Sequence, residues 1–332
     1  MTPPTQDSTL RQEVVTTPTP QRRSHRSLRL SPAAGHQAKL FETPETGQDE
    51  RVTALDTRYE ELEINFDEHE RVFWKHMISQ SRPSYTMAML RDIRRAMNVL
   101  KSMFRDYRGE GEPPVKFVVF ASRMPGIFNL GGDLPLFVEL IRAGDREGLR
   151  DYAHACIELQ YWRATKLGLP YLSVSLVQGD ALGGGFEATL ADDVIIAERK
   201  AKFGLPEILF NLFPGMGAYS FLSRRLDQVR AEQMIFSGRV YTAEEMHEIG
   251  LVDELVEDGM GEHALYDFIE RNRRNYRSRL AVYEARRRTG SITHEELIAI
   301  TDSWVETALN LDKSDVRRME RLAKAQDRRR QK

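Results

Sequence analysis

The chain has 332 residues and a formal net charge of −2, with 41% hydrophobic and 30% charged residues, which permits one large α/β domain or two smaller ones. No apolar run approaches the ~20 residues of a membrane span, no secretory signal is evident, and the balanced charge argues against nucleic-acid binding. The single cysteine, Cys156, excludes an intrachain disulfide and favours a cytoplasmic location. Neither it nor the histidines have metal-ligand spacing, so we expect no metal and no cofactor.

The first 52 residues are rich in Pro, Thr, Ser, Gln and Arg and contain almost no aromatic residues. Such a segment cannot bury enough apolar surface to offset chain entropy, so residues 1–52 are predicted to be a disordered tail. The basic stretch 22–29 resembles a transit peptide only weakly because acidic residues flank it on both sides, and a solvated tail is the favoured interpretation.

The first elements are expected just after Thr57. Apolar and polar residues alternate from Leu62 to Phe66, which predicts a strand. A polar turn at 67–70 leads into apolar residues 72–74, and together these segments predict a hairpin. Apolar residues at helical spacing across 89–104 then predict a helix.

Three short continuous apolar runs follow, at 117–120, 171–177 and 194–196. Runs of this kind are typical of strands that are covered on both faces. A helical stretch at 135–166 separates the first two runs. Strands that alternate with helices predict an α/β fold with right-handed crossovers.

After residues 214–217 the pattern is helical almost to the end, and we found no internal repeat. After the predicted tail we divide the chain into a core with the active site at 53–255, a helical region at 256–312 and a strongly basic helix at 313–332. A solvated tail is the favoured interpretation of the basic helix. Contact with an acidic partner is the alternative.

A triple glycine with a nearby acid is the strongest chemical signal in the chain. Residues 183–187 read Gly-Gly-Gly-Phe-Glu and follow a predicted strand, and residues 203–208 read Phe-Gly-Leu-Pro-Glu-Ile. Glycines let the backbone approach a ligand closely, and a helix N-terminus favours negative charge. Glu187 and Glu207 could each be ordinary first-turn helix acids. Together they indicate acid–base chemistry on a carbonyl compound whose oxygen becomes anionic.

Several longer segments resemble the crotonase (enoyl-CoA hydratase/isomerase) superfamily. They occur in the family's order over about residues 57–310, at 177–187, 202–208, 213–217, 236–245 and 250–252. The resemblance implies a spiral of ββα repeats and a helical C-terminal region that drives assembly of a homotrimer or hexamer.

The resemblance also implies roles for individual residues. The backbone N–H groups of Gly132 and Gly184 would form an oxyanion hole, and Glu187 and Glu207 would be the two catalytic acids. An enolate oxyanion needs such donors, each typically worth about 10²–10³ in rate. Two close carboxyl groups in an apolar pocket have their proton affinities pushed apart, which suits an acid and a base. Which glutamate is which stays open.

Two segments resemble a narrower group, the diffusible signal factor synthases that make cis-2-unsaturated fatty acid messengers. Residues 128–134 read Phe-Asn-Leu-Gly-Gly-Asp-Leu, and residues 213–221 read Phe-Pro-Gly-Met-Gly-Ala-Tyr-Ser-Phe. This resemblance implies dehydration of a 3-hydroxyacyl thioester on acyl carrier protein, followed by hydrolysis to the free acid. It also implies a sensor kinase receiver domain as a possible partner.

An acyl tunnel would need apolar walls near these acids. The candidates are residues close to the motifs in the sequence, together with one tryptophan of the helical region: Leu134, Phe137, Leu182, Gly183, Phe213, Met216 and Trp304. Ordinary core packing is the alternative for each of them. An acidic carrier protein would need a basic landing area, for which Arg123, Arg142, Arg146 and Arg150 are candidates, although solvated helix charges would look the same.

Two other functions remain open. The chain could be an enoyl-CoA hydratase of fatty-acid degradation, with coenzyme A as the carrier and a trans product. It could also be a regulatory or binding protein with this fold. Retention of both Glu187 and Glu207 argues against a purely binding role.

Overall fold

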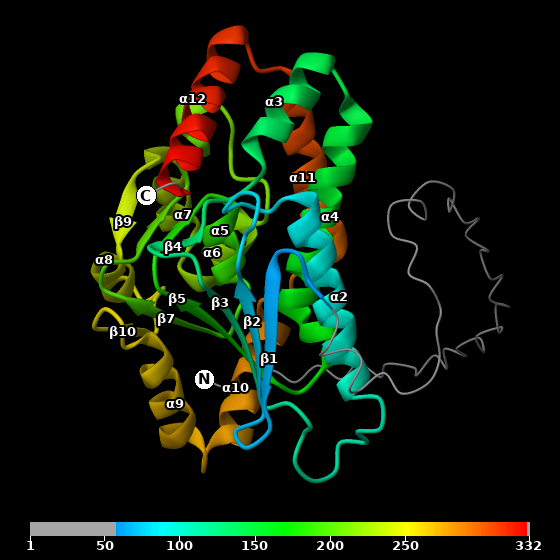
Figure 1. The fold of residues 1–332 in the computed structure, drawn as a ribbon, viewed down its shortest axis with the longest axis vertical. Helices are drawn as coiled ribbons and strands as arrows, with labels where there is room; N and C mark the ends of the chain where they lie inside the picture. Colours follow the sequence, from blue (N-terminus) through cyan, green and yellow to red (C-terminus); the bar gives the residue numbers. More distant parts are fainter. Residues whose placement is uncertain (1–57, 331–332) are drawn as a thin grey trace, which may run out of the picture. The chain divides into compact units, whose positions relative to one another are not determined.

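The computed structural model describes residues 58–330 (Figure 1). Strands β1 (Leu62–Asp67) and β2 (Val72–Met77) form the expected antiparallel hairpin, in which Leu62 lies opposite Met77. The predicted disordered tail at residues 1–52 lies outside the described residues.

The larger sheet is built on this hairpin. Within residues 58–330 it has six strands in the order β1-β2-β3-β5-β7-β10, and every pairing after the hairpin is parallel. The added strands are β3 (Phe117–Ser122), β5 (Leu172–Val177), β7 (Val194–Glu198) and β10 (Glu254–Val256). The strands predicted from continuous apolar runs are confirmed, and β3, β5 and β7 are buried along their whole length because helices cover both faces.

A second sheet contains short strands that the sequence analysis missed. Its order within the described part of the chain is β4-β6-β8-β9. These strands are β4 (Ile127–Asn129), β6 (Asp180–Leu182), β8 (Lys202–Gly204) and β9 (Val240–Thr242). Three residues are too few to show the alternation on which strand prediction depends.

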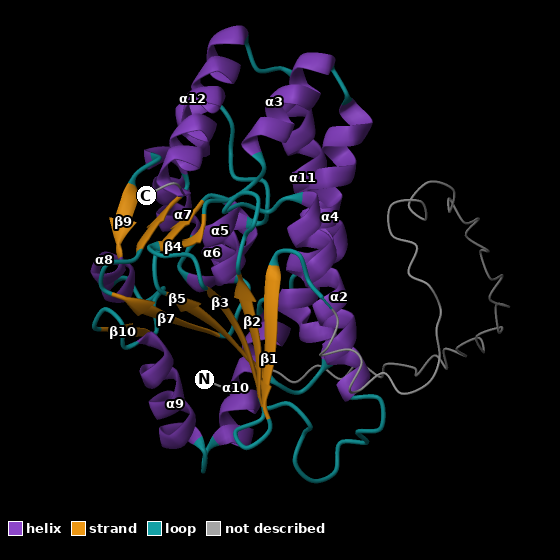
Figure 2. Ribbon diagram, viewed as in Figure 1, coloured by secondary structure: helices purple, strands orange, loops and turns teal. Residues whose placement is uncertain are grey.

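The two sheets share a repeating chain path, and Figure 2 shows strands of both sheets in orange. Strands β3, β5 and β7 of the larger sheet are each followed by a short strand of the second sheet, β4, β6 and β8 in turn, and then by helical structure. This is the ββα repeat that the resemblance implied. The repeat exists in the chain path, although no repeat was apparent in the sequence.

The predicted helical stretch at 135–166 is two helices. Helix α3 (Leu134–Ala143) ends at Gly144, which has a left-handed φ of 64°. Asp145 then accepts a hydrogen bond from the amide of Gly148 and caps α4 (Arg146–Thr165). A left-handed glycine followed by a capping aspartate ends one helix and starts the next.

The remaining helices are spread along the described chain, and those labelled η are short 3₁₀ helices. They are α2 (Met87–Met103), η1 (Lys166–Gly168), α5 (Gly184–Leu190), η2 (Pro206–Phe210), α6 (Ala218–Arg225), α7 (Gln228–Ser237), α8 (Ala243–Glu248), α9 (Gly261–Asn272), α10 (Tyr276–Thr289), α11 (His294–Leu309) and α12 (Lys313–Arg330). None of the helices within residues 58–330 is both long and apolar enough to cross a membrane.

Helices cover both faces of the larger sheet. Leu265, Phe268 and Ile269 of α9 belong to the buried cluster that includes Val119 and Val174 of the sheet. On the other face, α2 packs against α4, and α4 packs against α11 (Figure 1). The sheet is therefore a fully covered core layer, as its apolar strands require.

Helix α12 differs from the expected solvated tail. Val316, Met319 and Ala323 are buried on one side of it, and the helix packs against α3 and η2. Gln326 donates a hydrogen bond to the carbonyl oxygen of Leu130 at 3.0 Å. The apolar residues recur at spacings of three and four, so a basic helix still has an apolar stripe that packs on the domain.

Candidate active site

The glycine loop joins the second sheet to helix α5. Gly183 has a left-handed φ of 51° and stands immediately before the helix, and its amide donates to the carbonyl oxygen of Gly204 at 2.8 Å. A Cβ on Gly185 would lie 2.1 Å from the carbonyl oxygen of Asn129. The glycines are therefore required by backbone conformation at one position and by close approach of backbone at another.

Two backbone amides lie close together beside this loop. A Cβ on Gly184 would lie 3.6 Å from the amide nitrogen of Gly132, and one on Gly131 would lie 3.0 Å from the amide nitrogen of Gly184. Within residues 58–330, neither Gly132 nor Gly184 donates a hydrogen bond outside its own helix or strand. Two close donors without acceptors have the character of an oxyanion hole.

Glu187 lies one turn into α5 and is 1% exposed. Its Oε1 accepts hydrogen bonds from the amides of Met216 at 2.8 Å and Ala218 at 3.0 Å. These bonds favour the ionised form, but burial has the larger effect and raises the pKa of Glu187 to about 7.

Glu207 is the second residue of η2 and lies against the glycine loop. A Cβ on Gly183 would be 2.6 Å from its Oε1, and its Oε2 is buried with no hydrogen-bond partner in the described part of the chain. Burial, and after it the charge of Glu187, raise the pKa of Glu207 well above its usual range. The two carboxyl groups therefore retain at least one proton between them near neutral pH.

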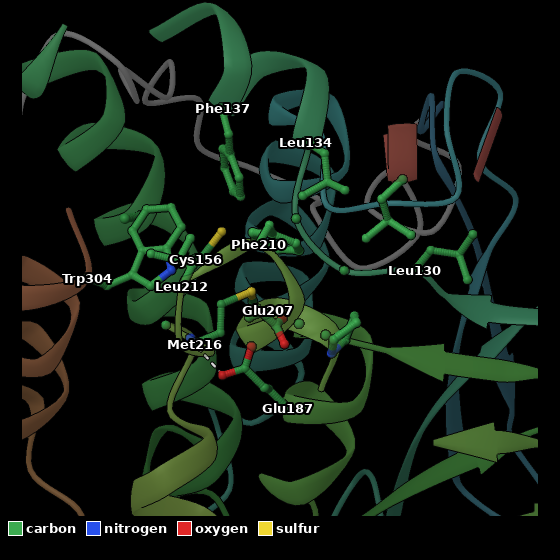
Figure 3. A pocket seen from close by; sticks show the side chains of 18 of the residues that line it. Leu130, Leu134, Phe137, Cys156, Glu187, Glu207, Phe210, Leu212, Met216 and Trp304 are labelled. Atoms are coloured by element: carbon green, nitrogen blue, oxygen red, sulfur yellow. Dashed lines mark hydrogen bonds between the residues drawn. The ribbon is translucent and has the colours of Figure 1, made fainter. Parts of the chain in front are cut away.

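Both glutamates point into one cavity of about 50 Å³, shown in Figure 3. Its wall is mostly apolar, and in addition to Gly131, Gly132, Gly183, Gly184, Glu187 and Glu207 it includes Leu130, Leu134, Phe137, Tyr152, Ala153, Cys156, Pro206, Phe210, Leu212, Gly215, Met216, Trp304, Leu322 and Gln326. A small-molecule site usually has some 300–1,000 Å³. A ligand with a chain of several carbons would therefore have to displace side chains.

Three aromatic side chains and one methionine lie close together in the wall. The ring of Phe137 lies 5.0 Å from that of Tyr152 and 5.1 Å from that of Trp304. The sulfur of Met216 lies where a Cβ on Gly184 would be only 2.4 Å away. Met216 therefore lies against Gly184 of the glycine loop, and Figure 3 shows its side chain beside that of Glu187.

Most of the expected wall residues line this cavity, but Leu182 and Phe213 do not. Leu182 is the last residue of β6, before the chain turns into the pocket at Gly183, and Leu212 takes the place expected for Phe213. Lining residues that were not expected from the sequence include Phe210 of η2, and Leu322 and Gln326 of α12. The helical spacing of apolar residues in α12 was the available signal.

Cys156 also lines the cavity, where burial raises the pKa of its thiol to about 12. At neutral pH it is a thiol and a poor nucleophile. Within residues 58–330 no group of three or more His, Cys, Asp or Glu side chains is arranged to hold a metal ion.

The arginines considered as a landing area for a carrier are all in ion pairs. Arg123 contacts Glu262 at 2.6 Å and Arg142 contacts Glu320 at 2.8 Å. Arg146 pairs with Glu306 and Arg150 with Asp302. These pairs connect elements within the chain, which supports the simpler interpretation of Arg142, Arg146 and Arg150 as solvated helix charges. Arg123 directly follows strand β3 and is not in a helix.

Comparison with known families agrees with this geometry. Residues 94–288, more than half of the chain, match the family described as enoyl-CoA hydratase/isomerase. The chain belongs to this family, which places it in the crotonase superfamily.

Individual relatives match only part of this chain. Mitochondrial methylglutaconyl-CoA hydratase of Rattus norvegicus is 28% identical over 207 residues, which cover 59% of this chain and 55% of the relative. Mevalonyl-coenzyme A hydratase SIDH of Beauveria bassiana is 42% identical over 86 residues, 26% of this chain and 31% of the relative. The chain spans about half the length of the mitochondrial relatives that it matches.

Solved structures confirm the fold. The enoyl-CoA hydratase from Bacillus halodurans superposes with a TM-score of 0.64 at 20% sequence identity, over 78% of this chain and 99% of that one. The α/β architecture with parallel sheets and C-terminal helices is therefore that of the crotonase fold.

Proposed function

We propose that this protein adds water to, or removes it from, the Cα–Cβ bond of an acyl thioester. The observation that carries this proposal is a pair of glutamates that face one apolar cavity beside two amides without acceptors. Glu187 is buried, and Glu207 is half-buried with a buried Oε2. Both acids have a raised pKa, so a carboxylate and a carboxylic acid can coexist near neutral pH.

The roles follow from the chemistry of a 3-hydroxyacyl thioester. The amides of Gly132 and Gly184 would bind the thioester oxygen and stabilise the negative charge that develops on it. The carboxylate would take the α-proton, and the carboxylic acid would protonate the departing hydroxyl group, which leaves as water. Hydration is the same set of transfers in reverse.

The cavity wall indicates the kind of acyl group. Leu134, Phe137 and Trp304 present apolar surface next to the acids, which suits an aliphatic chain. A cavity of about 50 Å³ is too small for such a chain, so the chain would enter by displacing flexible side chains such as Met216.

The first test is turnover of 3-hydroxydodecanoyl thioesters by the purified full chain, followed by mass spectrometry. We expect loss of water from the substrate, with at least 100-fold slower turnover in Glu187→Gln and in Glu207→Gln. Wild-type turnover in either variant would refute the assignment. If the unaltered protein turns over neither the carrier-protein ester nor the coenzyme A ester, a regulatory or binding role would be favoured.

We propose a narrower function as well, synthesis of a cis-2-unsaturated fatty acid signal by dehydration and then hydrolysis of the thioester. Its support is that the two segments that resemble such synthases contribute directly to the cavity. Leu130, Gly132 and Leu134 come from the first segment, and Gly215 and Met216 from the second.

The same assay separates this function from fatty-acid degradation. Free cis-2-dodecenoic acid, formed mainly from the carrier-protein ester, would support the synthase. Reversible formation of a trans-2-enoyl-CoA without release of free acid would support an ordinary hydratase. A sensor kinase receiver domain as a partner would be a consequence of the synthase function.

A further inference from the structure

A second and larger cavity lies outside the candidate active site. It is an open cleft of about 720 Å³ between the end of α4, the end of α5, α6 and α10, and it shares no lining residue with the glutamate pocket. Its volume is within the range of small-molecule sites, some 300–1,000 Å³.

Arginines dominate the polar wall of this cleft. Five of its lining residues are arginines, from α6 and α10: Arg224, Arg225, Arg286, Arg287 and Arg288. Only three lining residues are acids: Asp192, Asp193 and Glu284. The wall therefore has more positive than negative charge.

The acids of the wall are already engaged, and Glu284 pairs with Arg288 at 2.6 Å. Among the arginines, Arg224 pairs with Glu296, which lies outside the cleft, at 2.7 Å. Asp192 pairs with Arg163, which approaches from outside the cleft. Asp193 is shared by Lys166 and Arg287, each at 2.8 Å, and by Arg286 at 3.7 Å. One carboxylate facing three cations leaves positive charge uncompensated.

Arg225 adds a cation that has no acid of its own. Its guanidinium donates to the carbonyl oxygens of Leu190 and Asp192 and makes no ion pair with any of residues 58–330. It is half-buried in the wall, and the charge of Arg286 opposes its own. A guanidinium stays charged in proteins. The charges of Asp253, Asp192 and Asp193 act against this repulsion, but none of them is in ion-pair contact with Arg225, so a further anion close to both arginines would be favourable.

We propose that this cleft binds a phosphate-bearing small molecule. Guanidinium groups match phosphate oxygens with two parallel hydrogen bonds, and several of them converge here from two helices. Leu169, Pro170 and Ile292 add apolar surface to the same cleft. A ligand with a charged phosphate end and a less polar body, such as a nucleoside diphosphate, fits both parts.

The test is calorimetric titration of the full chain with inorganic phosphate, pyrophosphate and ADP at constant ionic strength. We expect saturable binding of pyrophosphate, weakened at least tenfold in the double variant Arg286→Gln, Arg288→Gln. Their side chains are 42% and 78% exposed, so the fold should tolerate the change. Tighter binding of ADP than of pyrophosphate would support the apolar wall as part of the site.

Two further variants distinguish loss of the binding site from loss of the folded structure. Glu284→Gln removes an exposed acid from the wall and should tighten pyrophosphate binding severalfold, which unfolding cannot mimic. Arg230 is an exposed arginine of α7 that pairs with Asp227 outside the cleft. The variant Arg230→Gln should therefore bind pyrophosphate like the unaltered protein. Absence of saturable binding of all three probes, or equal affinity in every variant, would overturn the proposal.

Discussion

Glu187 and Glu207 face the same cavity but are held differently. Oε1 of Glu187 accepts two backbone hydrogen bonds, from Met216 and Ala218, whereas Oε2 of Glu207 has no partner in the described part of the chain. The ionised form is therefore better supported at Glu187, and the charge of Glu187 makes ionisation of Glu207 harder. Because the two carboxylates are stabilised unequally, Glu187 and Glu207 differ in proton affinity.

Activity should depend on pH through this pair. As the pH falls through about 7, Glu187 takes up a proton and the pair loses its carboxylate, so the rate of dehydration should fall about tenfold per pH unit below that point. A pH profile of kcat for the 3-hydroxyacyl thioester checks this. A rate that stays constant between pH 5.5 and 8 would contradict the role of the pair.

Glu187→Gln should raise stability while it removes activity. The folded-state pKa of Glu187 is about 7 against an ordinary value of 4.5, so the folded state binds more protons and loses stability as the pH rises from about 4.5 to 7. A neutral amide avoids that loss and can still accept both backbone hydrogen bonds. We expect a gain on the order of 1–3 kcal/mol in the free energy of unfolding at pH 8.

Denaturant unfolding at pH 8 and at pH 4 measures this effect. The gain should be much smaller at pH 4, where Glu187 is protonated in both states. A variant that is less stable than the unaltered protein at pH 8 would show that burial of Glu187 is not the dominant influence.

Gly132→Ala should impair the site through a specific contact. The new Cβ would lie 2.6 and 2.7 Å from two ring carbons of Phe137, so the ring or the turn must shift and the Gly132 amide would move with it. A small misplacement of a catalytic donor can cost ~100-fold in rate. Thioester turnover should therefore fall, with little change in melting temperature.

Phe137→Leu provides the matched rescue. A smaller side chain leaves room for the Cβ, so the double variant Gly132→Ala, Phe137→Leu should be more active than Gly132→Ala alone. If the second change does not restore any activity, the contact with Phe137 is not the cause of the loss.

Lys75→Met should stabilise the protein. The Lys75 ammonium lies in the core, 3.6 Å from the sulfur of Met97 and 5.3 Å from the centre of the Phe120 ring, and it makes no ion pair with the residues described. Burial lowers the pKa of Lys75 to about 7 from 10.5. Between these values the unfolded state binds more protons, so the stability of the unaltered protein should rise with pH.

Methionine has a similar length and no charge, so Lys75→Met should add on the order of 1–3 kcal/mol near pH 7. The stability gain should shrink as the pH approaches 10. Equal stability of both proteins across this range would mean that Lys75 has a partner that stabilises its charge.

The sequence by itself determined the hairpin, the long buried strands and the motifs around Glu187 and Glu207. Those features depend on local periodicity and on glycines that the backbone requires, and both are visible in the order of residues. The ββα repeat was implied by a family resemblance, because strands such as β4 and β6 have only three residues.

Only the tertiary structure decided which residues close the pocket and how the charges are paired. Gln326 of α12 reaches Leu130, nearly two hundred residues earlier in the chain, and the five arginines of the second cleft come together from two separate helices. The pKa of Glu187 likewise depends on burial by distant segments. Contacts between segments far apart in sequence set these properties, and they follow from packing that local pattern does not specify.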